Sequence, residues 1–145
     1  MRTINKQQKN AGFIFSVFQD SKSKDENLKN HDAMLKTLIL KNVSFKPVQG
    51  KYTYENGKTS SELGYYVESN EVMNDHELYD FVNQQCVLYN QESFLSIDSE
   101  RNARLIFNNG KSENLGKFQC VDKDVAESSQ AYTYCPKTDY YFICR

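Results

Sequence analysis

The sequence lacks the segments that would place the protein in or across a membrane. No apolar run in its 145 residues approaches the ~18 residues that a spanning helix needs. The N-terminal stretch MRTINKQQKNAGFIFSVF has too short an apolar run, and no small-residue cleavage site, for a signal peptide. We therefore expect a cytoplasmic protein with no membrane partner.

The chain also lacks a surplus of charge of either sign. Its 18 basic and 19 acidic residues give a net charge of −1, and no block of Lys and Arg interrupts the mixture. Proteins that bind nucleic acid usually carry a basic surplus, which displaces counterions from the phosphates. We therefore expect no nucleic-acid partner.

Common catalytic and metal-binding motifs are missing as well. The six glycines are scattered singly, which excludes dinucleotide-binding and phosphate-loop patterns, and neither HExxH nor GxSxG occurs. No CxxC or CxH spacing indicates a zinc site, so we expect no metal and reduced, partly buried thiols. The cysteines are Cys86, Cys120, Cys135 and Cys144. A nucleophilic cysteine would need a histidine beside it, but His31 and His76 both fall in predicted helices.

The composition that remains is that of one globular domain spanning residues 1–145. The chain is 39% hydrophobic and 26% charged, and it contains ten Tyr, nine Phe and no Trp. Tyr and Phe suit the half-buried surface of a sheet, so the fold should contain one. We expect residues 1–11 to form a flexible N-terminus.

Periodicity predicts an alternation of strands and helices in the first half of the chain. The dense run 12–18 indicates a strand, and apolar residues at spacings of three and four predict a helix over 27–41 that ends at Asn42. An extended segment follows over 43–54, with a break or bulge at Gly50. Asn56 and Gly57 indicate a hairpin turn, which leads into a return strand over 63–69.

A second helix and further strands follow. Asn74 or Asp75 is the expected N-cap, with an inner stripe formed by Leu78, Phe81 and Val82. The run CVLYN (86–90) predicts a fourth strand, and SFLSI with ARLIFNN predicts another hairpin. Residues 111–145 form a C-terminal extension with two short β-like pieces, which could be an added strand or cover an edge.

The element order is therefore β-α-β-β-α-β with extra C-terminal strands, which predicts an α+β fold of the ferredoxin-like, split βαβ type. Such a four-stranded sheet carries both helices on one face. Because aromatic residues occur on both faces of strands such as GYYV, we expect another subunit to cover the second face.

Several polar or aromatic residues near strand ends are candidates for a site, and each also has an ordinary structural interpretation. Glu62 could be a solvated hairpin carboxylate, Tyr52 a packing residue and His31 a core histidine. Gln91, Glu92 and Ser93 follow a predicted strand, where binding groups often gather, but a plain turn is the more common explanation for such residues.

Short blocks of the sequence resemble a known enzyme family. The blocks FSVF (15–18), NLKNHDAMLKTL (27–38), GKYTY (50–54), SELGYYV (61–67) and QQCVLYN (84–90) occur in order at suitable separations. They are similar to the phage enzymes that degrade S-adenosylmethionine, first described as hydrolases and now regarded as lyases. The resemblance covers roughly residues 12–110, and the last ~35 residues match nothing identified.

The resemblance implies a homotrimer similar to the PII signalling proteins, with active sites between subunits, no cofactor and S-adenosylmethionine as substrate. It implies that Glu62 is the essential carboxylate and Tyr52 its companion, with Tyr54 as the alternative tyrosine. Phe15 and Phe18 are expected to offer ring faces to the adenine and the sulfonium. Further expected polar contacts to the substrate come from Ser16, His31, Gln91, Glu92 and Ser93.

The implied activity is cleavage of S-adenosylmethionine to methylthioadenosine and homoserine lactone, which would serve a phage against restriction enzymes of its host. Two other functions stay open on the sequence. A non-catalytic PII-like trimer could bind or sequester a nucleotide ligand, and an interaction protein could block a host enzyme through its aromatic face.

Overall fold

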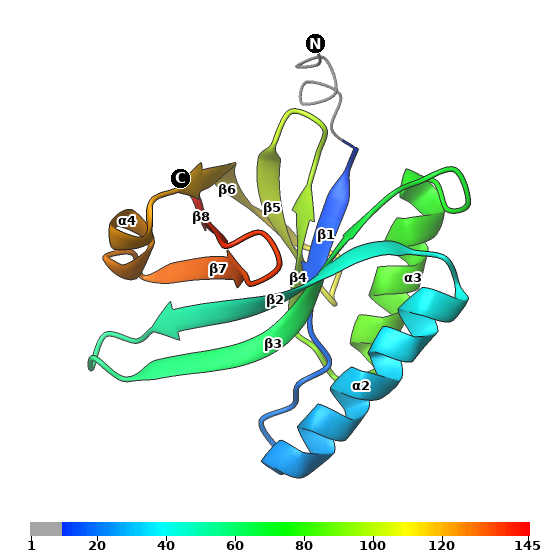
Figure 1. The fold of residues 1–145 in the computed structure, drawn as a ribbon, viewed down its shortest axis with the longest axis horizontal. Coiled ribbons are helices and arrows are strands. Elements are labelled where there is room, and N and C mark those ends of the chain that lie inside the picture. The colour runs from blue at the N-terminus through cyan, green and yellow to red at the C-terminus, as the bar shows by residue number, and fades with distance from the viewer. Residues whose placement is uncertain (1–9) are drawn as a thin grey trace.

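The computed structural model describes residues 10–145, which form an α+β fold of eight strands and three helices within that range. The strands are β1 (Gly12–Phe15), β2 (Ser44–Thr53), β3 (Thr59–Glu68), β4 (Ser93–Ile97), β5 (Asn102–Phe107), β6 (Ser112–Val121), β7 (Ala131–Cys135) and β8 (Tyr140–Cys144). The helices are α2 (Lys24–Leu40), α3 (Asp75–Leu88) and α4 (Lys123–Glu127). All neighbouring strands are antiparallel, and they close into a barrel in the order β1-β3-β2-β7-β8-β6-β5-β4 (Figure 1).

Half of the barrel has the strand order β4-β1-β3-β2, with α2 connecting β1 to β2 and α3 connecting β3 to β4. This is the order of a split βαβ sheet, and it confirms the predicted α+β class. Figure 1 shows both long helices on one side of the barrel. No helix within residues 10–145 is both long and apolar enough to cross a bilayer.

Side-chain hydrogen bonds at the first turn fix where the two long helices begin. Ser23 and Asn74 each form a capping box, with Glu26 and Glu77 respectively, which satisfies free N–H groups of the first turn. The Ser23 box starts α2 at Lys24, three residues before the predicted start. The side chains that α2 buries are Asn27, His31, Met34 and Leu38.

The main core lies between these helices and the outer face of β1 and β3. Tyr65, Val67, Leu38, Leu78 and Val82 are fully buried there. Alternation along β3 points Tyr65 and Val67 toward the helices and Glu62, Gly64 and Tyr66 toward the barrel interior. The sheet therefore buries aromatic residues on both faces, as the GYYV segment predicted.

The predicted strand over residues 86–90 is wrong. Cys86 and Leu88 belong to the last turn of α3, and Tyr89 is its C-cap. A short apolar run fits a helix or a strand equally well, and here Cys86 extends the buried helical stripe of Leu78 and Val82. The fourth strand is instead β4, which pairs with β5 as the predicted hairpin.

Gly50 neither breaks nor bulges its strand, which corrects a second expectation. The pairing of β2 with β3 runs without interruption from Ser44↔Glu68 to Thr53↔Thr59. Two turn predictions are confirmed by left-handed backbone angles: Asn42, with φ of 57°, follows α2, and Gly57, with φ of 84°, lies in the hairpin.

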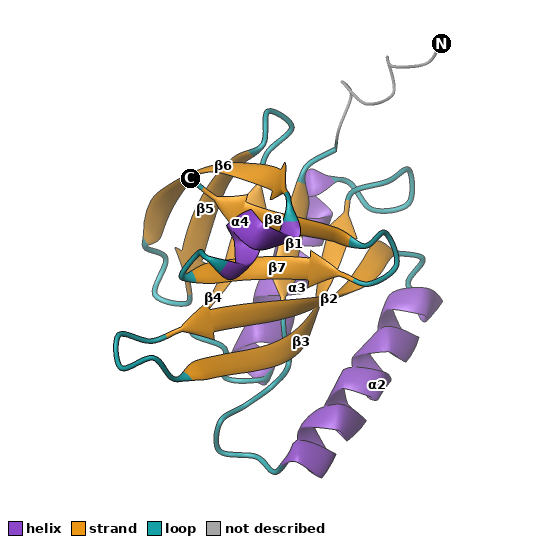
Figure 2. Ribbon diagram, turned by 60° about the vertical axis from the view of Figure 1, so that its left-hand side comes forward, coloured by secondary structure: helices purple, strands orange, loops and turns teal. Residues whose placement is uncertain are grey.

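The C-terminal extension completes the barrel, which corrects the expectation that another subunit covers the second sheet face. Strand β6 pairs with β5 and β8, while β7 pairs with β8 and β2 (Figure 2). The same chain therefore closes over the face that the sequence seemed to leave free. The homotrimer stays a prediction.

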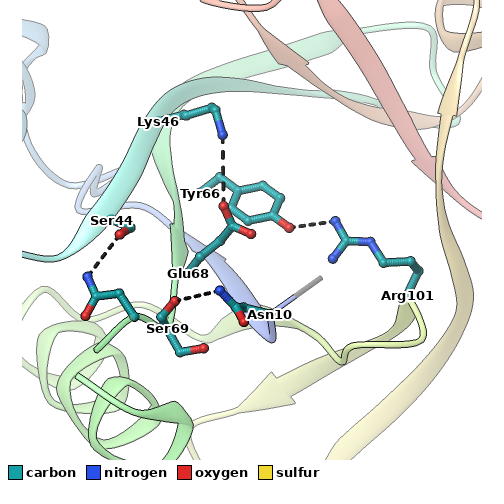
Figure 3. Close-up of polar contacts among 8 residues, drawn as sticks. Asn10, Ser44, Lys46, Tyr66, Glu68, Ser69 and Arg101 are labelled. Atoms are coloured by element: carbon teal, nitrogen blue, oxygen red, sulfur yellow. Dashed lines mark hydrogen bonds and ion pairs between the residues drawn. The ribbon is translucent and has the colours of Figure 1, made fainter. Parts of the chain in front are cut away.

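One end of the barrel is held by polar contacts around the last residues of β3 (Figure 3). The guanidinium Nη2 of Arg101 donates to the Tyr66 hydroxyl at 2.7 Å, and Lys46 forms an ion pair with Glu68 at 4.0 Å. Asn10 Nδ2 donates to the Ser69 carbonyl oxygen at 3.1 Å. Asn10 and Ala11, the last two residues of the predicted flexible segment 1–11, are thus tied to Ser69, whose N–H donates to the Ala11 carbonyl oxygen at 3.2 Å, and residues 1–9 lie outside the described residues.

Two glycines on facing strands give a matched test of this packing. A Cβ at Gly64 would lie 2.7 Å from the Phe15 carbonyl oxygen, whereas a Cβ at Gly50 would meet nothing closer than 3.9 Å. We expect Gly64→Ala to lower the free energy of unfolding by about 1–3 kcal/mol, because backbone atoms must move. Gly50→Ala is the control and should leave it unchanged or slightly higher in urea titrations. Equal effects of the two substitutions would contradict the close β1–β3 approach.

Candidate active site

The barrel encloses an open cavity of about 850 Å³. Ligand pockets for small molecules typically measure ~300–1,000 Å³, so the cavity has room for one such molecule. Its wall draws on strands from both halves of the chain and combines aromatic, aliphatic and hydroxyl side chains with a few charged ones. Members from the β4-β1-β3-β2 half of the barrel and its connections include Ser16, Val48, Tyr52, Ser60, Glu62 and Ser93.

Glu62 lies on β3 directly opposite Gly50 on β2. Both residues line the cavity. Because Gly50 has no side chain, the space in front of the Glu62 carboxylate stays open to a ligand. The sequence predicted Glu62 as the principal site residue, and the structure places it in the cavity wall.

The surroundings of Glu62 make its charged form less favourable than it is in water when the cavity holds no cation. Burial in the cavity wall raises the pKa of the carboxyl group, and the negative charge of Asp20 raises it further. The side chain still reaches solvent through the cavity, and it has no hydrogen-bond or ion-pair partner among residues 10–145. A positively charged ligand would lower the pKa again, so binding such a ligand favours the carboxylate.

Tyr52 lies on the same face of the sheet as Glu62, one residue pair further along. It pairs with Ser60, and such diagonal neighbours lie within reach of long side chains. Its hydroxyl accepts a hydrogen bond from Gln130 Nε2 at 2.9 Å, and its ring meets Tyr54 edge-on at 4.9 Å between centroids. The structure therefore places Tyr52 beside Glu62 with its hydroxyl bonded to the C-terminal extension. Tyr54, the alternative tyrosine, does not line the cavity.

Three further predicted residues border the cavity, and two of them also hold its wall together. The Ser16 hydroxyl donates to the Leu63 carbonyl oxygen at 2.7 Å and accepts from the Phe18 N–H at 3.0 Å, so it fastens the end of β1 to β3. The Gln91 side-chain amide donates to the carbonyl oxygens of Phe18 and Tyr89. Ser93 opens β4 beside them.

The other predicted residues lie apart from the cavity or turn their rings from it. The Phe15 ring packs in the main core, 5.0 Å from that of Tyr65, although the residue borders the cavity. His31 stacks on Tyr65 at 4.7 Å, and burial lowers the pKa of its imidazole. Phe18 meets His31 edge-on, and Glu92 is exposed to solvent. The structure thus separates these four side chains from Glu62.

Sequence reasoning missed the part of the wall that comes from the C-terminal extension. Phe118 and Phe142 stack at 4.7 Å in the cavity, and Glu113, Leu115 and Gln130 also line it. The sequence indicated two short β-like pieces in this extension, but no local signal shows which distant strands they join. These residues could have been found only after the barrel closure was known.

A ligand-sized cavity with an unpaired, partly desolvated carboxylate and aromatic walls is an arrangement that suits a small cationic molecule. The chain matches the model of the S-Adenosylmethionine lyase family over residues 13–145, and it belongs to that family. It is therefore a lyase, and membership implies S-adenosylmethionine as its substrate. The match extends through residue 145, which corrects the expectation that the resemblance ends near residue 110. A search of curated proteins found no match.

The raised pKa of Glu62 predicts a pH-dependent cost to stability. Between the unfolded and the raised folded pKa, the folded protein binds the proton more tightly, so stability falls as pH rises through that window. We expect Glu62→Gln to raise the melting temperature at neutral pH. The gain should vanish below about pH 4, where the carboxyl group is protonated in both states. Thermal melts across this range, with the exposed Glu127→Gln as control, check it; a Glu62→Gln protein that melts lower at neutral pH would contradict it.

Proposed function

We propose that the protein cleaves S-adenosylmethionine to 5'-methylthioadenosine and L-homoserine lactone. The observation that carries this proposal is the position of Glu62: an unpaired carboxylate with a raised pKa in the wall of a cavity large enough for one nucleoside-sized ligand. Family membership supplies the substrate, and the cavity supplies a place where its positive charge is favoured.

The proposed reaction takes both reacting groups from the substrate. The methionyl carboxylate attacks the γ-carbon, and one carbon–oxygen bond forms as the carbon–sulfur bond breaks. The bonding electron pair passes to sulfur, so the sulfonium leaves as the neutral thioether of methylthioadenosine. No proton moves and no water is consumed, so the protein needs neither a general base nor a cofactor.

In this proposal the protein acts by holding the substrate in a folded conformation. Glu62 fixes the cationic part by charge attraction, and the opposed Gly50 leaves room for it. Orientation of an intramolecular attack can supply at most ~7–11 kcal/mol. The aromatic walls at Phe118 and Phe142 exclude water, which otherwise solvates the separated charges of the substrate.

Tyr52 has a supporting role in the proposal. Its ring flanks the Glu62 side of the cavity, and the Gln130 amide fixes its hydroxyl at 2.9 Å. A phenol held this way limits how Glu62 and the ligand can move, and the ring offers a face to a cation. Loss of the hydroxyl should therefore matter less than loss of the carboxylate.

The proposal includes the homotrimer with sites at subunit interfaces and the phage counter-defence role that the resemblance implies. Tyr52 and Tyr54 support the former, because they are 40% and 51% exposed on the β2–β3 hairpin beside the cavity. Depletion of S-adenosylmethionine would starve restriction enzymes and methyltransferases that use it.

Substitutions at the two principal residues test the proposed activity. We expect Glu62→Gln to lower the rate of methylthioadenosine release about a hundredfold, since one preorganised charge is removed, with the oligomeric state unchanged. Tyr52→Phe should lower it less. Chromatographic measurement of methylthioadenosine, with Glu127→Gln as the control, checks both. Near-normal turnover by Glu62→Gln would remove the assignment, and a wild-type protein that binds the substrate without releasing methylthioadenosine would be a sequestering protein.

The fate of water separates lactone formation from hydrolysis. We expect the reaction in ¹⁸O-labelled water to release homoserine lactone that carries no label at the earliest times, because the ring oxygen comes from the substrate carboxylate. Mass spectrometry of fresh product gives the result. Labelled homoserine that appears before any lactone would show that water is the nucleophile.

A further inference from the structure

We propose that Glu113 is a second cation-binding residue of the cavity and that it receives the ammonium group of the substrate's amino acid portion; this assignment rests on the function proposed above. Glu113 belongs to the C-terminal extension, to which the sequence assigned no role. It lines the same cavity as Glu62.

The barrel order sets the two carboxylates on opposite walls. In the sequence of eight strands, β3 is second and β6 is sixth, so β3 and β6 lie across the barrel from each other. Glu62 is on β3 and Glu113 is on β6. A ligand between these walls can therefore meet one carboxylate on each side.

Glu113 is the one acid on a largely apolar stretch of the wall. It pairs with Leu105 across the strands, and both Leu105 and Leu115 line the cavity beside it. Within residues 10–145 no lysine, arginine or hydrogen-bond donor pairs with its side chain, so its charge is available to a ligand.

The chemistry of the ligand matches two separate carboxylates. S-adenosylmethionine carries two cations, a sulfonium and an ammonium, and a single carboxylate cannot contact both equally. A sulfonium has no N–H to donate and suits the partly desolvated Glu62. An ammonium is strongly hydrated and has three donors, so it suits Glu113, which lies at the start of β6 and, like Glu62, is reached by solvent.

Equilibrium binding of two ligands that the protein cannot cleave distinguishes the Glu62 subsite from the Glu113 subsite. S-adenosylhomocysteine has the ammonium group but a neutral thioether in place of the sulfonium, whereas methylthioadenosine has neither cation. We expect Glu113→Gln to weaken binding of S-adenosylhomocysteine about tenfold, as for a lost charge-assisted hydrogen bond, and to leave binding of methylthioadenosine unchanged. Unchanged methylthioadenosine binding also shows that the variant keeps the cavity intact.

Two further variants serve as comparisons for Glu113→Gln. Glu62→Gln should affect S-adenosylhomocysteine less than Glu113→Gln does, and Glu127→Gln on α4 should affect neither ligand. The inference is overturned if Glu113→Gln binds S-adenosylhomocysteine as wild type does or loses both ligands equally. It is also overturned if wild-type protein binds S-adenosylhomocysteine no more tightly than methylthioadenosine. Neither ligand is a substrate, so these results stand apart from the turnover assay that tests the proposed function.

Discussion

The pairing of β7 with β2 is the interaction on which the cavity depends. It joins the C-terminal extension to the split βαβ half through the rungs from Gln49↔Tyr134 to Tyr52↔Ala131, and the Thr53 N–H continues it by donating to the Gln130 carbonyl oxygen at 2.7 Å. Without this seam β2 would be an open edge, and the inner face of β3 would lie on the surface. With the β7–β2 pairing in place, Glu62 lies in the cavity wall instead of on an exposed hairpin. The same seam brings the Gln130 side chain to the Tyr52 hydroxyl.

Closure of the barrel affects both the stability of the protein and its proposed activity. A carboxylate that is partly removed from water and has no partner costs free energy at neutral pH, and Glu62 is held in that condition by the wall around it. The wall keeps the carboxylate unpaired until a cation arrives, and the cation then stabilises the ionised form. This is the expected arrangement for a residue kept for binding, since a structural carboxylate at that position would gain stability from a basic neighbour.

Local signals in the sequence predicted most of the first half of the fold. Helical spacing and the capping residues Ser23 and Asn74 define α2 and α3, and Asn56-Gly57 defines the β2–β3 hairpin. Glu62 and Tyr52 could be chosen because a family resemblance singled them out, and the strand register then brings them to one face. The run from Cys86 to Asn90 misled because four consecutive apolar residues carry no decisive period, and only the buried stripe of α3 decides for a helix.

The second half of the site could not be predicted because it depends on pairing between strands far apart in the chain. Short apolar stretches around Phe118 and Phe142 indicate strands, but pairing partners at such separations are chosen by the global closure of the sheet. The expectation of a covering subunit arose from the correct observation that β3 has apolar residues on both faces; the error was to assume that a four-stranded sheet must find its cover outside the chain. The barrel brings carboxylates from β3 and β6 to opposite walls of one cavity, so neither half of the chain can form the proposed two-cation site alone. For the proposed reaction, in which the substrate supplies nucleophile and leaving group, that shared cavity is the main contribution of the fold.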